Sequence, residues 1–271
     1  MSLTKDEMKT LFDAPFKYPK TQHLKGSKGV TETGQVALPD LDCDRIIIEE
    51  KLDGAEVAIG FNDLGGDYLR NRNSALGHFQ FDPFHTWFYP QRESLRRALG
   101  EAQHILFGEW LFAKHTVYYD ALPSYFMAFD IYDIANDKWL TTQARRDLLD
   151  GTGTCHVPVL YEGPVEEAPS LDTLIRPSLY KTENWETALR EQCESKGYLW
   201  EKAQEETDFS KKSEGLYVKA EKGDEVVGFY KYIREGFLRT IIESGSHWAS
   251  REIIPNRIAH EGTHHRRPNV S

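Results

Sequence analysis

Short apolar runs, several of them alternating with polar residues, are the strongest pattern along the chain. Such runs of four to nine residues, bounded by glycine, proline or acidic residues, are typical of β-strands. The clearest is the run of three isoleucines in Arg45–Glu50. We expect strands at residues 45–50, 55–61, 67–71, 104–112, 125–133, 156–160, 215–220 and 225–233.

Helical periodicity occupies stretches between and around these strands. Helices are expected at residues 4–12, 92–99, 142–149 and 183–195, and residues 235–242 also read as a helix. The third has a threonine at its N-cap, Thr141 or Thr142, and Gly151 after its end. Strands follow strands too often for a regular βαβ repeat, so an α+β fold of antiparallel β-sheets with peripheral helices is predicted.

The chain has no internal repeat, low-complexity tract or long Pro/Gly/Ser linker. We therefore expect a single domain over residues 1–245, which includes an N-terminal helix and a basic loop within residues 1–44. Residues 246–271 are expected to form a C-terminal appendage.

Composition narrows the class of protein. With 271 residues, 39% hydrophobic and 12% aromatic, the chain is globular, and no apolar run approaches the roughly 20 residues of a membrane span. The first residues are too polar for a signal peptide, so a cytoplasmic location without a membrane partner is expected. A net charge of -10 argues against an indiscriminate nucleic-acid coat. It leaves room for local basic patches, such as Phe16–Lys28, whose cations and hydroxyls suit phosphate contact.

The most informative candidate for chemistry is Lys51-Leu52-Asp53-Gly54, which directly follows a predicted strand. A lysine ammonium, with an ordinary pKa of about 10.4, becomes a nucleophile only where its surroundings favour the neutral amine. Asp-Gly is also a common hairpin turn. These four residues alone are compatible with a surface turn or with a displayed nucleophile.

Further short segments with complementary chemistry follow in order. They are Leu69–Ser74 with Arg70 and Arg72, Gly108-Glu109-Trp110-Leu111, Phe129-Asp130-Ile131-Tyr132-Asp133, Glu214-Gly215-Leu216-Tyr217-Val218-Lys219, and Gly228–Arg234 with Lys231. Together with Lys51–Gly54, this ordered set resembles the covalent nucleotidyltransferase superfamily of ATP-dependent ligases and mRNA capping enzymes, most closely the RNA ligases. The resemblance runs from about residue 45 to residue 234 and implies a nucleotidyltransferase, ATP-grasp-like core.

The resemblance implies a reaction and its participants. Lys51 would attack the α-phosphorus of ATP, forming lysyl-AMP and releasing pyrophosphate. The implied catalytic residues are Lys51, Glu214 and Lys231, with Glu214 binding Mg²⁺ or Mn²⁺. The implied nucleotide contacts are Glu49 or Glu50 near the adenine amino group, Arg70 or more favourably Arg72 at phosphate or ribose, Glu109 at the ribose, Phe129 stacked on adenine, and Lys219 and Lys231 at phosphate oxygens. Such a cluster of cations around Lys51 would also depress its pKa by repulsion between like charges.

One departure from the family pattern concerns the last motif. Many members have two lysines one residue apart, whereas Lys231 stands between Phe229 and Ile233, with Arg234 next. Either Lys231 acts with Lys219, or Arg234 replaces one lysine despite its different geometry. The 37 residues after Arg234 are too few for the OB-fold of DNA ligases and capping enzymes, which favours RNA.

The expected function is ATP-dependent RNA ligation, in RNA repair or processing, joining 5'-phosphate and 3'-hydroxyl ends through lysyl-AMP and RNA-adenylate. End-healing enzymes are candidate partners. The alternatives are a DNA ligase, another polynucleotide adenylyl- or guanylyltransferase, or a non-catalytic nucleotide- or RNA-binding relative.

A few other polar residues have two interpretations each. Lys114-His115 could approach a phosphate or be structural. His23 and Ser27 could belong to the nucleotide or RNA face or to a surface loop. Asp130 and Asp133 could assist a metal or serve as turn residues.

Overall fold

The structure is a computed structural model. It describes residues 16–29, 31–72, 76–246 and 248–259. The helix expected at residues 4–12 lies outside the described residues.

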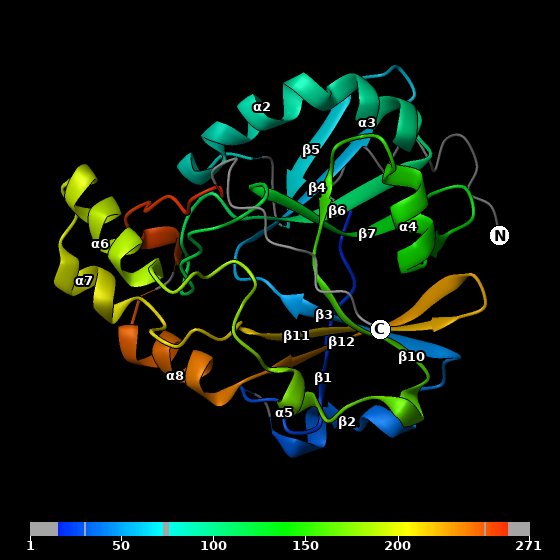
Figure 1. The fold of residues 1–271 in the computed structure, drawn as a ribbon. Helices are drawn as coiled ribbons and strands as arrows, with labels where there is room; N and C mark the ends of the chain where they lie inside the picture. Colours follow the sequence, from blue (N-terminus) through cyan, green and yellow to red (C-terminus); the bar gives the residue numbers. More distant parts are fainter. Residues whose placement is uncertain (1–15, 30, 73–75, 247, 260–271) are drawn as a thin grey trace.

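Two six-stranded sheets form the body of the described part of the chain, stacked as two layers in Figure 1. The first sheet has the order β10-β3-β11-β12-β1-β2. Its strands are β1 (Gln22–Leu24), β2 (Gln35–Val36), β3 (Arg45–Lys51), β10 (Val159–Gly163), β11 (Gly215–Lys222) and β12 (Glu225–Ile233). The second has the order β5-β4-β6-β7-β8, with β9 beside β7. Its strands are β4 (Ala55–Phe61), β5 (Asp67–Asn71), β6 (His104–Trp110), β7 (Phe126–Asp133), β8 (Lys138–Trp139) and β9 (Cys155–His156).

The predicted α+β class is confirmed, and most neighbouring strands are antiparallel. Parallel pairs occur at β1, which lies beside both β12 and β2, and between β7 and β9. The strand predicted at residues 156–160 is in fact two, β9 and β10, which join different sheets. Pro158 stands between them, and a proline without an N–H interrupts a strand ladder.

Helices lie on the outer faces of the sheets and at one end of the molecule. Figure 1 shows α2 (Asp82–Phe88) and α3 (Arg92–Leu99) over the second sheet, and α5 (Leu171–Leu174) beneath the first. At one end lie α6 (Trp185–Lys196), α7 (Trp200–Glu205) and α8 (Glu235–Ser244). The predicted helix at 142–149 is α4 (Thr142–Leu149), with the hydroxyl of Thr141 capping the amide of Ala144. Single 3₁₀ turns occupy Glu32–Gly34, Leu38–Asp40, Phe79–Phe81, Tyr89–Gln91, Val165–Glu167 and Trp248–Ser250.

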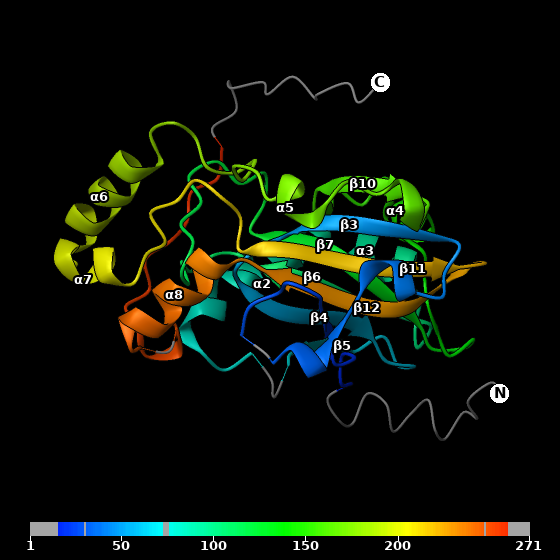
Figure 2. The same cartoon turned by 90° about the horizontal axis from the view of Figure 1, so that it is seen from below.

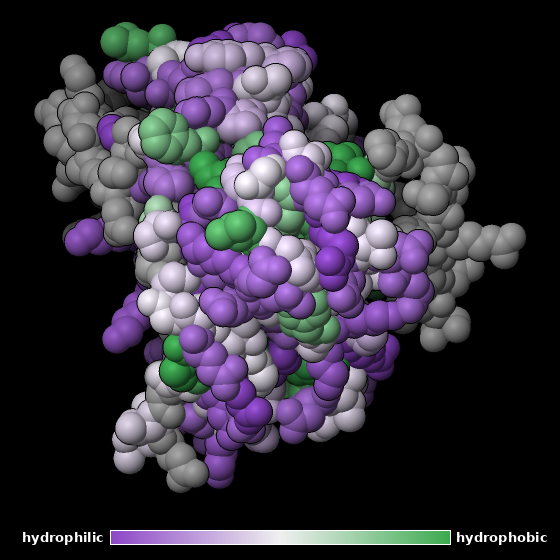
Figure 3. Space-filling view, turned by 90° about the vertical axis from the view of Figure 1, so that its left-hand side faces the viewer, coloured by the Kyte–Doolittle hydropathy of each residue, from purple (hydrophilic) through white to green (hydrophobic). Residues whose placement is uncertain are grey.

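The outside of the molecule is mainly polar. Figure 2 shows the same layers from below, with α6, α7 and α8 grouped at one end. Figure 3 views that end directly and shows a mostly hydrophilic face on which hydrophobic residues are scattered. In the part of the chain that the structure describes, no helix has the length and apolar character needed to cross a membrane.

Strand alternation sorts the side chains into layers. On β3 and β11 of the first sheet, Ile46, Ile48, Leu216 and Val218 face outward into one apolar cluster. On the second sheet, the outer face buries residues of β4, β6 and β7 against the aromatic side chains of α2 and leucines of α3. The inner faces, which look toward each other, carry the polar residues of interest.

The link Lys51–Gly54 crosses from one sheet to the other, because β3 belongs to the first sheet and β4 to the second. The hairpin alternative for this motif is therefore wrong. A Cβ on Gly54 would lie 2.6 Å from the carbonyl oxygen of Trp110 and 2.8 Å from a methyl of Leu111. Glycine is required here by the close approach of β6, not by a positive φ.

A buried cluster of four charged side chains joins the sheets from inside. Glu49 of β3 pairs with Arg145 of α4 at 2.9 Å and with Lys219 of β11 at 3.0 Å. Lys219 also pairs with Asp130 of β7 at 2.9 Å. Each of the four is at most 2% exposed, and the two carboxylates balance the two cations. Such a cluster is tolerated only while its partners remain complete.

The described residues after position 245 pack into the domain. Asn256 is buried and donates from Nδ2 to the carbonyl of Leu111 at 2.8 Å, while its Oδ1 accepts from the amide of Tyr119 at 2.8 Å. Ile254 is also buried, beside Tyr118. The domain limit at residue 245 stays a prediction, and these contacts support extending it to include residues 248–259.

We expect Gly54→Ala to destabilise the protein by about 1–3 kcal/mol, because the added methyl meets backbone that cannot move without displacing β6. Urea unfolding measures the change. Gly34→Ala is the matched control, since a Cβ there meets no atom within 4 Å. Equal stability of the two variants would contradict this account of the crossing.

We expect Arg145→Met to lower the free energy of unfolding by about 3–5 kcal/mol, since it leaves the buried charge of Glu49 short of a partner. The adjacent Arg146 pairs with Glu162 at 3.2 Å, with both side chains about one third exposed. Arg146→Met is therefore expected to change stability by only about 0–1 kcal/mol. Chemical denaturation measures the free energy of unfolding of both variants. Equal losses of stability in the two would contradict the prediction.

Candidate active site

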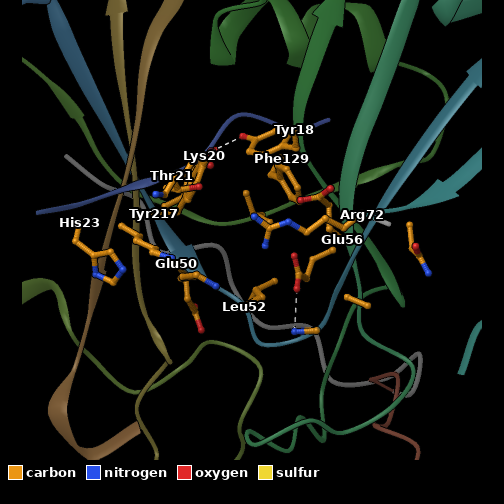
Figure 4. Close-up of a pocket in the computed structure, with 18 of the residues that line it drawn as sticks. Tyr18, Lys20, Thr21, His23, Glu50, Leu52, Glu56, Arg72, Phe129 and Tyr217 are labelled. Carbon is orange, nitrogen blue, oxygen red and sulfur yellow. Dashed lines mark hydrogen bonds between the residues drawn. The ribbon is translucent and has the colours of Figure 1, made fainter. Parts of the chain in front are cut away.

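A cavity of about 710 Å³ lies between the two sheets. Its lining includes Tyr18, Lys20, Thr21, His23, Glu49, Lys51, Glu56, Arg72, Glu109, Phe129, Tyr217 and Lys231. Figure 4 shows Lys20, Thr21, His23 and Tyr217 on the side of the first sheet, and Phe129, Glu56 and Arg72 on the side of the second. Residues far apart in the sequence therefore meet in one cavity.

The register of the strands explains which side chains of the first sheet form one wall of the cavity. Glu49 and Lys51 point to the same face of β3, since they are two residues apart. Tyr217 lies opposite Glu49, Lys231 opposite Tyr217, and His23 beside Lys231. Directly paired residues share a face, so these side chains form one row across four strands.

The wall from the second sheet carries carboxylates and an aromatic ring. Glu56 of β4 and Glu109 of β6 are directly paired, and Phe129 comes from β7. Burial raises the pKa of Glu56 to about 7 and that of Glu109 to about 8. The amide of Gly54 donates to Oε1 of Glu109 at 2.9 Å. The crossing link thus also fixes the position of this carboxylate.

Lys51 is held by an ion pair with Glu214, at 2.9 Å between Nζ and Oε1. Burial alone lowers the pKa of Lys51, but the charges of Glu214 and Glu109 outweigh it, and the net pKa is raised. Surrounding cations were expected to depress this pKa, and that expectation is wrong for this state because the carboxylates lie closer. Burial raises the pKa of Glu214 to about 7.

Asp53 supports the crossing and is not among the residues that line the cavity. Its Oδ2 accepts from the amides of Thr116 and Val117 at 2.6 and 2.7 Å, and its own amide donates to the hydroxyl of Tyr119 at 2.8 Å. These contacts tie the link to the segment after β6. Asp53 is therefore a positioning residue for Lys51.

The two glutamates before Lys51 lie on opposite faces of β3. Glu49 faces the cavity, where Arg145 and Lys219 hold it. Both cations also donate to the carbonyl of Phe129. Glu50 also contributes to the cavity lining, but its carboxylate lies on the other face of β3 and accepts from the amide of Leu179 at 3.4 Å. Burial raises its pKa to about 7. Of these two alternatives, Glu49 is the one whose carboxylate lies on the cavity face of β3.

Of the cations predicted to contact phosphate or ribose, Lys231 and Arg72 line the cavity. The other three, Arg70, Lys219 and Arg234, have other contacts. Arg70 lies over the ring of Tyr68, 5.7 Å from its centroid. Lys219 is fully buried in the charged cluster, where Glu49 and Asp130 engage its ammonium. Arg234 pairs with Asp208 and donates from Nε to the carbonyl of Ser213 at 2.5 Å. The geometry brings only Lys231 of the last motif to the cavity.

Some residues in or behind the cavity were not predicted from the sequence. Tyr18 bonds through its hydroxyl to Asp130 and to the hydroxyl of Tyr217. Neither Tyr18 nor Glu56 belongs to a recognisable motif, although Glu56 is directly paired with Glu109 of a predicted motif. Arg145 lies on α4, and no sequence pattern linked that helix to Glu49.

Most of the polar residues for which the sequence left two interpretations make structural contacts. Lys114 is buried and donates to the carbonyl of Glu206 at 2.9 Å, and His115 contacts the amide oxygen of Gln80 at 3.1 Å. Asp133 accepts from the amide of Asn136 at 3.1 Å, as a turn residue does. His23 is the exception, since it lines the cavity.

Within the described ranges, no group of three His, Cys, Asp or Glu side chains forms a ready metal site. Magnesium nevertheless binds commonly through one or two carboxylates, with water and substrate phosphates as its other ligands. Glu214, beside Lys51 and near Glu109, fits that donor set.

Comparison with known proteins identifies the family. No curated protein matches the chain. Among solved structures, an archaeal ATP-dependent RNA ligase is 17% identical, with a TM-score of 0.48, over 82% of this chain and 49% of that one. A Naegleria gruberi RNA ligase mutant with ATP and Mn is 18% identical, with a TM-score of 0.49, over 83% of this chain and 58% of that one. The chain thus spans about half the length of these structures. The family model described as RNA ligase matches residues 44–233, more than half of the chain. The chain therefore belongs to the RNA ligase family.

Proposed function

We propose that this protein is an ATP-dependent RNA ligase, which joins a 5'-phosphate to a 3'-hydroxyl through lysyl-AMP and RNA-adenylate. The observation that carries the proposal is the position of Lys51. Its ammonium pairs with Glu214 at 2.9 Å in a cavity whose other wall offers an aromatic ring and carboxylates. Family membership supports RNA as the substrate class.

The nucleoside would lie between Phe129, Glu49 and Glu109. Phe129 supplies a ring face for the base, and Glu49, held by Arg145 and Lys219, accepts a hydrogen bond from the amino group of adenine. Guanine has a carbonyl oxygen at the corresponding position, which an acceptor repels. Oε1 of Glu109 is taken by Gly54, so Oε2 remains for the ribose hydroxyls.

The phosphates would meet Lys231 and Arg72. Among the described residues, neither side chain has a carboxylate within ion-pairing distance, so both are available to an anion. Cations placed at non-bridging oxygens stabilise the transition state of phosphoryl and nucleotidyl transfer. Mg²⁺ or Mn²⁺ held by Glu214 would supply further neutralisation of phosphate charge.

Lys51 reacts only as the neutral amine. While Glu214 engages it, the raised pKa keeps it protonated. When Glu214 turns to another partner, burial is left as the main influence and favours the neutral form. The amine then attacks the α-phosphorus, a P–N bond forms, and pyrophosphate leaves.

The proposal also includes the RNA ends that are joined, the partner enzymes, the location and the cellular role. RNA ends with 5'-phosphate and 3'-hydroxyl are the proposed substrates, and enzymes that heal broken ends are the proposed partners. A cytoplasmic location and a role in RNA repair or processing fit this activity.

We expect Lys51→Ala to abolish a covalent adduct formed with ATP labelled at the α-phosphate in the presence of magnesium or manganese, because no other lysine among the described residues pairs with Glu214. Gel autoradiography and peptide mass spectrometry measure the adduct and its site. Lys25→Ala, on an exposed lysine outside the cavity, should label like the wild type.

A wild-type protein that binds ATP without forming an adduct would point to a non-catalytic binder. An adduct that survives in Lys51→Ala would also overturn the assignment of the nucleophile.

We expect ATP to be preferred over GTP in adduct formation by about tenfold to a hundredfold, the effect of one lost hydrogen bond to a charged group. Parallel assays with 5'-phosphate RNA and with nicked DNA should show sealing of RNA. Preferential sealing of DNA, or preferential labelling by GTP, would favour a DNA ligase or a guanylyltransferase instead.

A further inference from the structure

The segment Lys20–Ser27 contributes to the cavity although it precedes every motif of the family resemblance. Lys20, Thr21 and His23 all line the cavity. The short strand β1 places His23 there, because it runs parallel to β12 with His23 beside Lys231, and Lys20 and Thr21 come directly before this strand. Figure 4 shows His23 and Lys20 on the wall of the first sheet.

His23 is held in a defined orientation by Ser27. Its Nδ1 lies 2.8 Å from Oγ of Ser27, and that oxygen accepts from the amide of Ile233 at 2.9 Å. With one acceptor position used by Ile233, the serine hydroxyl is free to donate to Nδ1. In that arrangement the imidazole proton sits on Nε2, which has no hydrogen-bond partner among the described residues.

The turn that carries Ser27 is rigid. Gly26 has a φ of 90°, which favours glycine, and its amide donates to Oε1 of Gln35 at 2.8 Å. Nε2 of Gln35 donates in return to the carbonyl of Ser27 at 2.8 Å. Ser27 itself is only 2% exposed. A surface loop would need neither the burial nor this double contact.

Two lysines beside His23 form no ion pair with any described residue. In the described part of the chain, neither Lys20 nor Lys231 has a carboxylate within 4.0 Å, whereas Lys51 has Glu214. Burial lowers the pKa of His23, as do the charges of Lys231 and Lys51, so the ring is a neutral N–H donor at neutral pH. A cationic wall whose lysines have no ion pair, together with an oriented donor, is suited to an anion.

We propose that His23, Lys20 and Lys231 form a binding site for a second phosphate, separate from the α-phosphate of AMP. The occupant is either the 5'-phosphate of the RNA or the β,γ-phosphates of ATP. Lys231 lies between this site and Lys51 and would contact both. The inference rests on the proposed ligase function and adds the residues that select its second phosphate.

For the RNA 5'-phosphate, the reaction at this site is a transfer of AMP. An oxygen of the 5'-phosphate attacks the phosphorus of lysyl-AMP, and a P–O–P linkage forms as the P–N bond to Lys51 breaks. Lys51 leaves as the amine and takes up a proton. A phosphate held by His23 and Lys20 would be fixed within reach of that phosphorus.

Two single-turnover reactions of the full-length chain separate the two sources. The first is formation of lysyl-AMP from ATP, and the second is transfer of AMP from the isolated lysyl-AMP protein to 5'-phosphate RNA. If the site takes the RNA phosphate, His23→Ala and Lys20→Ala slow the second reaction by about tenfold to a hundredfold and leave the first nearly unchanged. If it takes the β,γ-phosphates, the first reaction slows instead and the KM for ATP rises.

Matched controls come from the same segment. Gln22→Ala, on the exposed neighbour in β1, and Lys25→Ala, outside the cavity, should behave as the wild type in both reactions. Lys20 is exposed, so Lys20→Ala is not expected to disturb folding, and thermal unfolding checks His23→Ala. Wild-type rates for both His23→Ala and Lys20→Ala in both reactions would overturn the inference.

Failure of the proposed function gives a different result. If the wild type forms no lysyl-AMP, calorimetric binding of inorganic pyrophosphate still tests the site. Binding by the wild type that Lys20→Ala and His23→Ala each weaken by about tenfold or more supports a phosphate site, and equal binding by all three proteins overturns it.

Discussion

The crossing of the chain from one sheet to the other at Lys51–Gly54 is the constraint on which the rest of the structure depends. It places the lysine where two walls meet, and it brings β6 so close that only glycine fits at position 54. The same link anchors itself through Asp53 and fixes Glu109 through an amide. The proposed nucleophile, the proposed ribose acceptor and the packing of the sheets are therefore not independent, since each depends on the same four-residue link.

The buried charges behind the cavity extend this coupling to the base site. Glu49 and the carbonyl of Phe129 share the cations Arg145 and Lys219. Ion pairs removed from water contribute little net stability, but they are intolerant of a missing partner. In this protein they hold the two proposed base contacts relative to each other, so the fold and the proposed selectivity for adenine rely on one network.

Local patterns in the sequence predicted the local parts of the fold. The strands at 55–61, 67–71 and 225–233 and the helix at 142–149 have the predicted bounds, because alternation and capping are properties of neighbouring residues. Partners distant in sequence could not be predicted in this way. The crossing was compatible with a hairpin, Arg145 had no visible link to Glu49, and β1 gave no sign that it runs parallel to β12. The pKa of Lys51 was also misjudged, because the sign of its shift depends on which of several charges lies closest.

The ion pair between Lys51 and Glu214 has a consequence for the resting protein. A buried amine in neutral form would react with any small electrophile that enters the cavity. Protonated and masked by a carboxylate, Lys51 is chemically silent. Only a ligand that draws Glu214 away frees the amine. In the proposed mechanism the carboxylate therefore protects Lys51 from a stray aldehyde or activated ester, because neither draws Glu214 away.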